Sequence, residues 1–405
     1  MPILFQINSA LGKGSTGHIA EIIATQARNV GWSCYIAHGP RFVGHSEMLS
    51  YQVSDKSEEF CHFIQSRLFD RHGLGSCSAT KRLICQIESI KPDVVHIHNI
   101  HGYYANYKLL FKYLAEKKFP TVMTMHDFWL MTGHCAYINK SCDKWKTGCG
   151  NCPRLGEYPS SMIDHSRKNW ELKKKLFGNF DKDKLVIVPV SYWLEGFAKQ
   201  SLLGDCKFSV IQNGVDTSLF RPYEGGHSDL YKSIDWKKHT IITVADRWTE
   251  ANGFNVIIKL SSMLPDDMQI LMVGLNDQQM QGLPEKIVGI SHTDNVNQLI
   301  ELYTAADVLF NASTEVTFGL VTAEAMSCGT PVIVFKNTAG EEIVDSLTGY
   351  VIDNVEEISD LVYKCREEAD TLKVGCIKRV IENFDSATQY SKYIDLYNSM
   401  LKKDR

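Results

Sequence analysis

Two acidic residues and a glycine that opens a helix, whose first N–H groups could bind an anion, lie in one stretch of the second half of the chain. In "NASTEVTFGLVTAEAMSCGTPVIVF" (311–335) a strand is expected to end near Asn311, and Phe318, Gly319 and Leu320 open a helix that carries Glu324. The first N–H groups of a helix have no internal partner, so this end attracts a phosphate. Glu324 could accept hydrogen bonds from hydroxyl groups such as those of a ribose. The other interpretation is a well-capped helix between two strands.

A glycine-rich turn near the start of the chain offers a second place for an anion. "ALGKGSTG" (10–17) places Gly12, Gly14 and Gly17 in a G-x-G-x-x-G pattern that also contains Ser15 and Thr16. Its strand–turn–helix context is that of a dinucleotide site. A nicotinamide site also needs an acid at the end of the second strand, and "CYIAHGP" (34–40) ends without one. The turn is therefore expected to hold a phosphate or a sugar, or simply to pack.

Four cysteines lie within the segment "GHCAYINKSCDKWKTGCGNCP" (133–153), namely Cys135, Cys142, Cys149 and Cys152. The last two form C-x-x-C. Four thiolates in a loop without its own hydrophobic core are typical of a structural tetrahedral zinc site. Reduced thiols without a metal are the second possibility. Disulfides are the third and least favoured possibility, because we expect a cytoplasmic protein (see below) and disulfides are rare in the cytoplasm.

Three further histidines, His96, His98 and His101, form H-x-H-x-x-H in "KPDVVHIHNIHG" (91–102). Side chains two residues apart point to the same face of a strand, so His96 and His98 are expected to point the same way. The pattern could bind zinc, but it contains no carboxylate that would support such a site. We expect these residues to lie at a strand end and to line a ligand-binding cleft, on the side that would receive the acceptor if the protein is a transferase.

The composition indicates an ordinary globular protein with an uneven distribution of charge. Of its 405 residues 44% are hydrophobic and 22% charged, and the length suits two or three domains. There is no signal-peptide or membrane-span pattern, so a cytoplasmic location is expected. Residues 1–200 carry 25 Lys and Arg against 17 Asp and Glu, whereas residues 201–405 carry 18 against 30. The basic half favours an anionic partner, such as a membrane surface or a phosphorylated ligand.

One segment, "RKNWELKKKLF" (167–177), concentrates the basic residues and interleaves them with Trp170, Leu172, Leu176 and Phe177. A basic amphipathic helix of this kind could lie on an anionic membrane. It could equally be a solvated surface helix.

Short apolar runs alternate with helical patterns along the whole chain, which predicts parallel sheets with crossover helices. We expect an α/β protein with two doubly wound domains facing each other across a cleft: residues 1–205, completed by a C-terminal helix at 386–405, and residues 206–385. Ligands of such domains bind beyond the carboxyl ends of the strands. The ten expected strands are Ile3–Asn8, Ser33–His38, Asp93–His98, Thr121–Met125, Leu185–Val190, Thr240–Ala245, Gln269–Val273, Ile287–Ser291, Val308–Asn311 and Pro331–Phe335.

Several stretches resemble retaining family 4 glycosyltransferases, which have the GT-B fold, and they occur in that family's order. The 311–335 stretch resembles the family's donor-binding signature, and "VADRWTEANGF" (244–254) resembles its loop with a basic pair. "KPDVVHIHNIHG" and "TMHDFW" (124–129) resemble elements of its capsule and exopolysaccharide members. The resemblance implies a nucleotide-diphosphate sugar as the donor, a retained anomeric configuration and no catalytic metal.

The resemblance also implies roles for individual residues. His126 matches a histidine that contacts the donor sugar, and Asp127 could orient it or accept a proton from the acceptor. Arg247, the Gly319 helix end and the Gly14–Gly17 turn would share the diphosphate. Preorganised donors aimed at the departing diphosphate lower the barrier, and Arg can form two parallel hydrogen bonds to phosphate.

Two positions depart from the family's pattern. The family has an acid eight residues before Glu324, where this chain has Val316, and Glu315 stands one residue earlier. The family has a Lys five residues after Arg247, where this chain has Asn252, which donates a hydrogen bond but carries no charge. We expect Glu315 to take the catalytic position through the flexibility of its loop.

The sequence therefore predicts a glycosyltransferase of surface polysaccharide synthesis, peripheral on the inner face of the membrane, with a lipid-linked saccharide as acceptor and no nucleic-acid partner. A sugar-nucleotide epimerase or phosphorylase on the same scaffold is the alternative enzyme. A catalytically degenerate sugar-binding subunit is the alternative without activity, because a fold alone does not establish catalysis.

Overall fold

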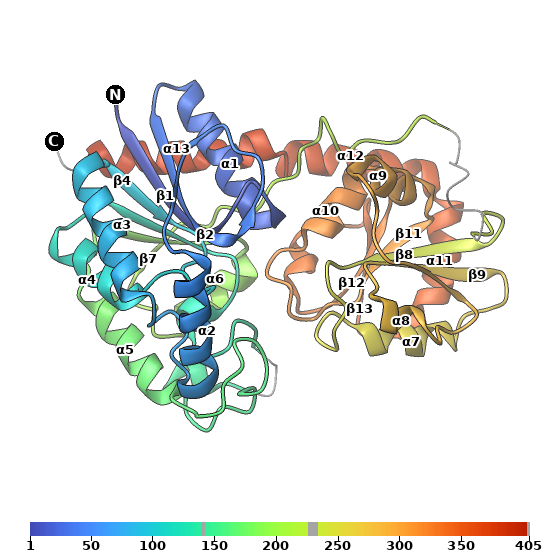
Figure 1. The fold of residues 1–405 in the computed structure, drawn as a ribbon. Helices are drawn as coiled ribbons and strands as arrows, with labels where there is room; N and C mark the ends of the chain where they lie inside the picture. Colours follow the sequence, from blue (N-terminus) through green and yellow to red (C-terminus); the bar gives the residue numbers. More distant parts are fainter. Residues whose placement is uncertain (139–141, 226–233, 403–405) are drawn as a thin grey trace. The chain divides into compact units, whose positions relative to one another are not determined.

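The computed structural model describes residues 1–138, 142–225 and 234–402 (Figure 1). The chain divides into an N-terminal unit, Met1–Gln212 with Tyr390–Arg405, and a C-terminal unit, Asn213–Gln389. Part of the predicted cysteine-rich insert (139–141) and of the predicted terminal helix (403–405) lies outside the described residues. Each unit contains its own parallel sheet and its own core, which confirms the predicted α/β class.

The N-terminal unit is built on a seven-stranded parallel sheet with the order β3-β2-β1-β4-β5-β6-β7. The chain starts in the middle of this sheet and proceeds to one edge, then returns beside β1 and proceeds to the other edge. The strand order therefore reverses between β1 and β4, which is where ligands bind in doubly wound folds. The strands are β1 (Ile3–Leu11), β2 (Ser33–Val43), β3 (Leu49–Gln52), β4 (Val94–Ile97), β5 (Thr121–Met125), β6 (Leu185–Pro189) and β7 (Lys207–Phe208).

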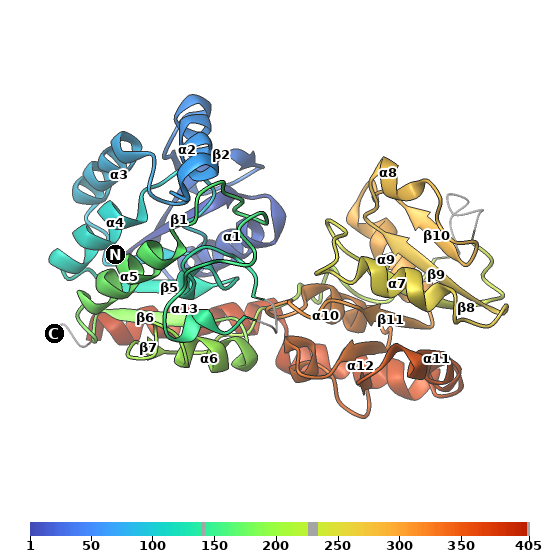
Figure 2. The ribbon, with the colours of Figure 1, turned by 90° about the horizontal axis from the view of Figure 1, so that it is seen from below.

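Helices pack on this sheet through apolar residues at helical spacing. Ile19 and Ile23 of α1 lie in one core cluster with Tyr393 and Tyr397 of the last helix, α13. Figure 2 shows α3, α4 and α5 next to one another, in agreement with their contacts. The helices of this unit, with α13 continuing into it from the C-terminal unit, are α1 (Gly14–Asn29), α2 (Lys56–Phe69), α3 (Cys77–Ile90), α4 (Tyr107–Glu116), α5 (Ser166–Gly178), α6 (Tyr192–Lys199), α13 (Ser386–Lys402) and the 3-10 turns η1 (Trp129–Met131) and η2 (Lys144–Lys146).

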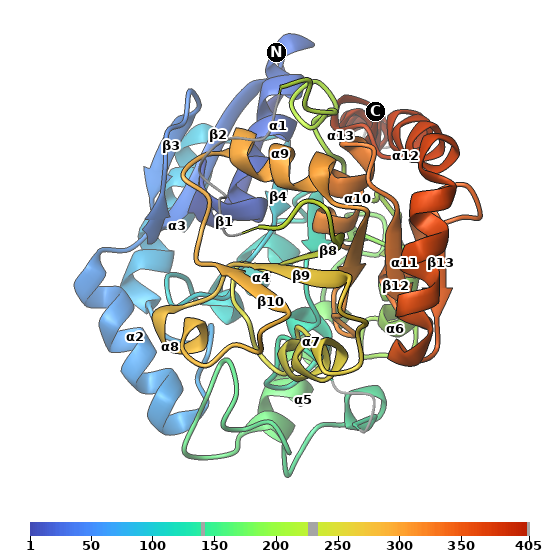
Figure 3. The same ribbon diagram turned by 90° about the vertical axis from the view of Figure 1, so that its right-hand side faces the viewer.

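The C-terminal unit has a six-stranded parallel sheet with the order β10-β9-β8-β11-β12-β13. Figure 3 shows α9 and α10 on one side of these strands and α7 on the other. The strands are β8 (His239–Val244), β9 (Met268–Val273), β10 (Ile287–Ile290), β11 (Val308–Asn311), β12 (Val332–Phe335) and β13 (Gly349–Ile352). The helices are α7 (Phe254–Ser261), α8 (Asp277–Met280), α9 (Val296–Ala305), α10 (Leu320–Ser327), α11 (Ile358–Glu367), α12 (Ala369–Asn383) and the 3-10 turns η4 (Ala339–Glu342) and η5 (Val355–Glu357).

All ten predicted strands are present, and three short strands were not predicted: β3, β7 and β13. Each of the three lies at the edge of its sheet. An edge strand is covered on fewer sides than a central strand, so its sequence is not uniformly apolar. β3 reads "LSYQ" and is mostly exposed, and β7 has only two residues. Such strands lack the apolar run by which the others were recognised.

The basic segment predicted as a possible membrane-binding helix is α5. Its aromatic and apolar residues Trp170, Leu176 and Phe177 are buried, and Lys173 is buried with them. The exposed residues of the helix are largely basic, and its apolar face is already occupied within the unit. The apolar face of α5 is therefore not available to a membrane, and the helix presents mainly its basic residues to the surroundings. None of the helices in the described ranges combines the length and the apolar character that a transmembrane helix requires.

Candidate active site

Two neighbouring strands of the N-terminal sheet lead into the predicted histidines. β4 and β5 pair in parallel and end at Ile97 and Met125, so His98 and His126 follow at the same edge. The Nδ1 atom of His98 lies 3.1 Å from the Nε2 atom of His126. The structure thus brings together two predicted site residues from separate motifs.

Asp127 pairs with a third histidine of the same edge. Its Oδ2 atom lies 2.6 Å from Nε2 of His101, and its Oδ1 accepts a hydrogen bond from the backbone N–H of Trp129 at 2.8 Å. Burial raises the pKa of Asp127, but the charge and hydrogen bond of His101 outweigh burial and hold that pKa below its ordinary value. Both carboxylate oxygens therefore have partners, and the ionised side chain fixes the turn that follows His126.

His96 lies beneath this cluster and is fully buried. Its Nδ1 lies 2.6 Å from the Tyr397 hydroxyl and its Nε2 lies 2.8 Å from Oγ1 of Thr124. His96 therefore supports the strand ends from inside the core. The ring nitrogens of His96, His98 and His101 are all hydrogen-bonded to other side chains. These three histidines therefore do not form a zinc site in this structure.

The glycine-rich turn combines a packing role with an open helix end. A Cβ atom on Gly12 would lie 2.0 Å from the carbonyl oxygen of His45, so this glycine is required by close approach of the backbone. Gly14 starts α1 with a φ of 67°, and no atom lies within 4 Å of a Cβ added there. Gly14 and Ser15 are exposed, and Thr16 is half-buried. The side chain of Lys13 does not cap the helix, so its first N–H groups face an accessible surface.

In the C-terminal unit, the two stretches with predicted donor-binding residues meet at one edge of the sheet. β8 and β11 pair in parallel, and the loops that follow them contact each other. The hydroxyl of Ser313 lies 3.4 Å from the carbonyl oxygen of Ala251. A Cβ atom on Gly253 would lie 2.4 Å from the Cβ of Ala312, so only glycine permits this approach. The loop with Arg247 is thereby held beside the loop that leads to α10.

Arg247 is exposed, as a ligand-binding cation at a strand end should be. Asn252 does not extend away from this loop: its Nδ2 atom donates a hydrogen bond to the carbonyl oxygen of Arg247 at 2.5 Å. Asn252 stands where the resembling family has a Lys. It therefore holds the backbone of the loop that contains Arg247.

The start of α10 is braced from the end of β11. Gly319 is the N-cap residue and provides no side-chain cap, while Nδ2 of Asn311 donates to Oγ1 of Thr322 at 3.0 Å. Phe318 is buried and Leu320, the first residue of the helix, is half-buried. The first N–H groups of α10, which no side chain caps, thus lie on the same edge of the sheet as the Arg247 loop. The hydrogen bond between Asn311 and Thr322 holds this end of the helix in place.

Glu324 lies on α10 and contacts the core. The hydroxyl of Tyr303 donates to its Oε2 atom at 3.3 Å. Burial raises the pKa of Glu324 to about 7. Glu315 is half-buried in the loop between β11 and α10, as is Val316 beside it.

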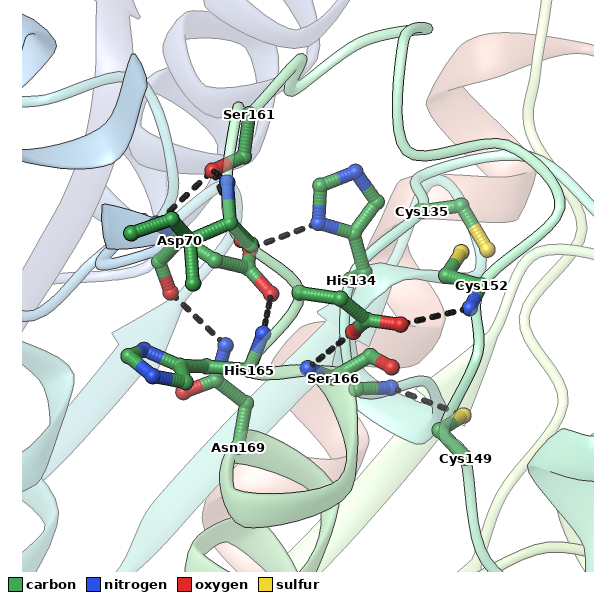
Figure 4. A network of polar contacts seen from close by, with 12 residues as sticks. Asp70, His134, Cys135, Cys149, Cys152, Ser161, His165, Ser166 and Asn169 are labelled. Carbon is green, nitrogen blue, oxygen red and sulfur yellow. Dashed lines mark hydrogen bonds and ion pairs between the residues drawn. The ribbon is translucent and has the colours of Figure 1, made fainter. Parts of the chain in front are cut away.

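The cysteine-rich insert lies in the N-terminal unit and encloses a cavity. The cavity is lined by the four predicted cysteines, Cys135, Cys142, Cys149 and Cys152, together with His134 and residues of the surrounding loop. Figure 4 shows the sulfur atoms of Cys135 and Cys152 close to each other. The Cys135 thiol donates to the Cys152 sulfur, which lowers the pKa of Cys152 to about 7, while burial raises the pKa of Cys149 to about 11.

All twelve cysteines are free, so the disulfide interpretation is wrong for this structure. Among the described residues, no three His, Cys, Asp or Glu side chains are arranged to hold a metal ion. The insert is instead tied to α2 through Asp70, whose Oδ1 lies 2.6 Å from Nδ1 of His134 (Figure 4). Both side chains are almost fully buried, and Nε2 of His134 has no hydrogen-bond partner in the described part of the chain.

Several residues that support the site were not predicted from the sequence. Gln6 accepts a hydrogen bond from His98, Tyr303 donates to Glu324, and Lys173 binds the carbonyl oxygens of Trp129 and Thr132. A signal existed for Gln6, which is the one amide within the apolar run "ILFQI". Tyr303 and Lys173 carry no comparable signal, because their sequence patterns are those of ordinary amphipathic helices.

Two family models match the chain, one in each half. Residues 47–219 match the model described as Glycosyltransferase Family 4, and residues 238–367 match the model described as Glycosyl transferases group 1. The first matched range contains the histidine cluster and the second contains Arg247, Gly319 and Glu324.

Curated relatives and solved structures agree with these matches. The chain is 24% identical over 384 residues to WcaC of Escherichia coli K12, a glycosyl transferase named for colanic acid biosynthesis, and the alignment covers 90% of each chain. Sucrose-phosphate synthase of Thermosynechococcus elongatus has the same fold, with a TM-score of 0.71, 15% identity and 99% of each chain covered. HepE of Anabaena, solved in complex with UDP, gives a TM-score of 0.66 at 16% identity and covers 98% of this chain and 100% of its own. As the sequence motifs predicted, this chain belongs to the family 4, group 1 glycosyltransferases and has their GT-B fold.

Proposed function

We propose that the protein transfers a sugar, with retention of configuration, from a nucleotide-diphosphate sugar to a saccharide acceptor. The observation that carries this proposal is the meeting of the Arg247 loop and the start of α10 at one edge of the C-terminal sheet. A guanidinium and a set of uncapped N–H groups at one edge suit a diphosphate, which gains negative charge as it departs. The UDP complex of the structurally similar HepE supports the same donor class.

The predicted residues on the donor side have distinct roles in this proposal. Arg247, the Gly319 helix end and the Gly14–Gly17 turn bind the diphosphate, and Glu324 accepts hydrogen bonds from ribose hydroxyls. Asn252 acts through Arg247 by holding its backbone. Glu315 stabilises the positive charge that develops on the sugar.

His126 and Asp127 divide two tasks in the N-terminal unit. His126 contacts the donor sugar. Asp127, which is bonded to His101 and to the turn after His126, orients this edge. Asp127 directly follows His126 in the sequence. We assign its carboxylate the second task, which is to receive the acceptor's proton.

The acceptor we propose is a lipid-linked saccharide of surface polysaccharide synthesis, met at the cytoplasmic face of the membrane. The basic character of residues 1–200 and the exposed basic side chains of α5 suit an anionic surface. The similarity to WcaC, named for colanic acid biosynthesis, supports this acceptor class.

Release of free nucleoside diphosphate tests the proposal. The protein is incubated with UDP- and GDP-sugars, with and without lipid-linked saccharide, and acceptor-dependent release is expected for one donor. Arg247→Ala should lower kcat/KM by about 10- to 100-fold, because a charge-assisted hydrogen bond contributes about 1.5–3 kcal/mol. Arg221→Ala, an exposed arginine of the same unit, is the matched control. Equal loss in both variants, or release that ignores the acceptor, would contradict the proposal.

Structural zinc at the cysteine-rich insert remains a prediction. Its support is that the four cysteines line one cavity together with His134, whose Nδ1 is held by Asp70. Metal analysis of the purified full-length protein tests it. One zinc per chain that is lost in Cys149→Ser and kept in Cys206→Ser is the expected result, and a metal-free wild-type protein would exclude the site.

A further inference from the structure

Helix α2 has its polar and apolar residues in the reverse of the usual arrangement. A helix of a globular protein normally turns its apolar stripe toward the core. The residues that α2 buries are polar, namely Glu59, His62 and Ser66. Phe60, Ile64 and Leu68 are exposed instead, and their spacing of four residues places them along one stripe of the helix. Within the described residues, this apolar stripe is not covered by the rest of the unit.

The segment that follows the cysteine-rich insert continues this apolar surface. The backbone N–H of Met162 donates to the carbonyl oxygen of Arg67 in α2 at 2.8 Å, and Figure 1 shows the segment beside that helix. Met162 is 68% exposed, and Ile163 is exposed as well. Two further apolar side chains therefore lie next to the end of α2. We call these five exposed residues the α2–insert surface: Phe60, Ile64, Leu68, Met162 and Ile163.

A buried polar network holds this segment against α2 (Figure 4). Its centre is Asp70, the residue that ends the helix. The backbone N–H of Asp70 donates to Oγ of Ser161 at 2.9 Å, and its Oδ2 accepts from the backbone N–H of His165 at 3.0 Å. Met162 and Ile163 lie between these two anchors. Turning them inward would break buried hydrogen bonds, so their exposure is built into the fold.

The glutamates of α2 are engaged within the unit. Oε2 of Glu58 lies 2.7 Å from a guanidinium nitrogen of Arg82. Oε2 of the buried Glu59 lies 2.9 Å from Nε of Arg41. Both carboxylates are therefore neutralised by neighbouring arginines, and neither adds an uncompensated negative charge beside the apolar stripe.

Basic side chains accompany the apolar ones instead. Lys56 stands four residues before Phe60, and Arg67 directly precedes Leu68. Lys56 and Arg67 are both exposed, as is Arg71 just beyond the helix. A face that combines apolar side chains with cations is complementary to an anionic lipid surface. The apolar groups enter the boundary between headgroups and acyl chains, and the cations bind the headgroup phosphates.

We propose that the α2–insert surface docks the protein on an anionic lipid membrane, with its apolar side chains in the headgroup region and Lys56 and Arg67 at the lipid phosphates. The choice of a membrane rests on the lipid-linked acceptor of the proposed function, whereas the exposed apolar surface does not. The proposal also gives the cysteine-rich insert a role, because the segment after it brings Met162 and Ile163 to the end of α2.

Co-sedimentation of the full-length protein with vesicles tests this surface without any nucleotide sugar. Vesicles of phosphatidylethanolamine and phosphatidylglycerol are compared with vesicles of phosphatidylcholine, and we expect stronger binding to the anionic vesicles. Phe60→Ser and the double variant Met162→Ser/Ile163→Ser should each weaken this binding by about tenfold or more, the range for burial of one apolar side chain. Arg67→Gln should weaken it at low salt and change it little at high salt.

Val374→Ser is the matched control, because it replaces an apolar side chain of α12 in the other unit that is 66% exposed. It should bind vesicles like the wild type. A wild-type protein that does not bind the anionic vesicles would overturn the proposal. So would full binding by Met162→Ser/Ile163→Ser, because the insert would then not belong to the surface. Self-association that Phe60→Ser abolishes, without vesicle binding, would assign the face to a second copy of the chain and overturn the membrane as partner.

Transfer assays separate this surface from the proposed function. With the lipid-linked acceptor in vesicles, Phe60→Ser should raise the KM for the acceptor by about tenfold. With the same acceptor dispersed in detergent, Phe60→Ser and wild type should have equal kinetics. Vesicle binding without use of any nucleotide sugar would mean that the proposed function fails while the surface stands. Transfer in detergent by a protein that binds no vesicles would mean the reverse.

Discussion

The Tyr303 hydroxyl lies 3.3 Å from Oε2 of Glu324, and this contact places the carboxyl group of a predicted donor-binding residue against the core of the C-terminal unit. Burial raises the pKa of Glu324 from 4.5 to about 7. The folded state therefore holds a proton that the unfolded state releases between these values. Stability from this group is present at low pH and is lost as the pH rises toward 7.

From this relationship we expect Glu324→Gln to be more stable than the wild type at pH 8 by about 1–3 kcal/mol, and to differ little at pH 4.5. The same variant should lose nucleotide binding, because an amide is a weaker acceptor for ribose hydroxyls. Urea unfolding at the two pH values measures the difference. Glu367→Gln, an exposed residue of α11, is the control and should show no such pH dependence.

Removal of His101 should affect Asp127 in acid. The pKa of Asp127 is held below its ordinary value in the folded state, so its contribution to stability is present above pH 4 and is lost as the pH falls through the folded pKa. His101→Asn removes the partner, so acid unfolding should begin at a higher pH. Transfer activity should fall by about 10- to 100-fold, since the lost bond is charge-assisted. His292→Asn, an exposed histidine, should change neither quantity.

Buried Lys173 predicts a stability that increases with pH. Its ammonium group lies 3.4 Å from the centre of the Trp129 ring and donates to the Thr132 carbonyl oxygen at 2.9 Å. Burial lowers its pKa from 10.5 to about 7. The unfolded chain therefore binds more protons between pH 7 and 10, and the free energy of unfolding should rise with pH by about 1 kcal/mol per unit.

Lys173→Met should remove this slope, and urea unfolding at pH 7, 8 and 9 would detect it. Lys175→Met, on the exposed side of the same helix, should keep the wild-type slope. Parallel slopes in all three proteins would mean that Lys173 is not the titrating group.

The two glycines of the first turn should respond differently to alanine. Gly12→Ala forces a Cβ atom onto the His45 carbonyl oxygen and should lower the melting temperature strongly or prevent folding. Gly14→Ala meets no atom and has only the strain of its φ of 67°, about 1 kcal/mol. If the turn binds the donor, Gly14→Ala should raise the KM for the nucleotide sugar while the protein stays folded. An unchanged KM would leave the turn with a packing role alone.

The sequence predicted the fold well wherever burial leaves a continuous apolar run. β9, "MQILMV", is buried throughout and was found, whereas β13, "GYVI", is partly exposed and was missed. The predicted strand at 33–38 continues to Val43, because its last residues pair beside β1 without being apolar on both faces. Pattern alone does not reveal where such a strand ends, although β2 lies between β1 and β3 in the sheet.

The candidate site was predicted where a residue lies in a motif, and was missed where a residue acts through a neighbour. His126 and Arg247 could be located by their place after a strand. The bond between Asn252 and the Arg247 carbonyl depends on the path of one loop, and the Gln6–His98 contact joins residues 92 positions apart. Such contacts arise from tertiary packing, which residue spacing does not encode.

The return of the chain to its first unit has a consequence for folding during synthesis. Tyr390, Tyr393 and Tyr397 of α13 fill the core beneath the first sheet, and the Tyr397 hydroxyl bonds His96 under the histidine cluster. The ribosome delivers these side chains only after the whole second unit has emerged. Until then the first unit exposes the apolar surface that α13 will cover, and this surface is open to non-native contacts in the nascent chain.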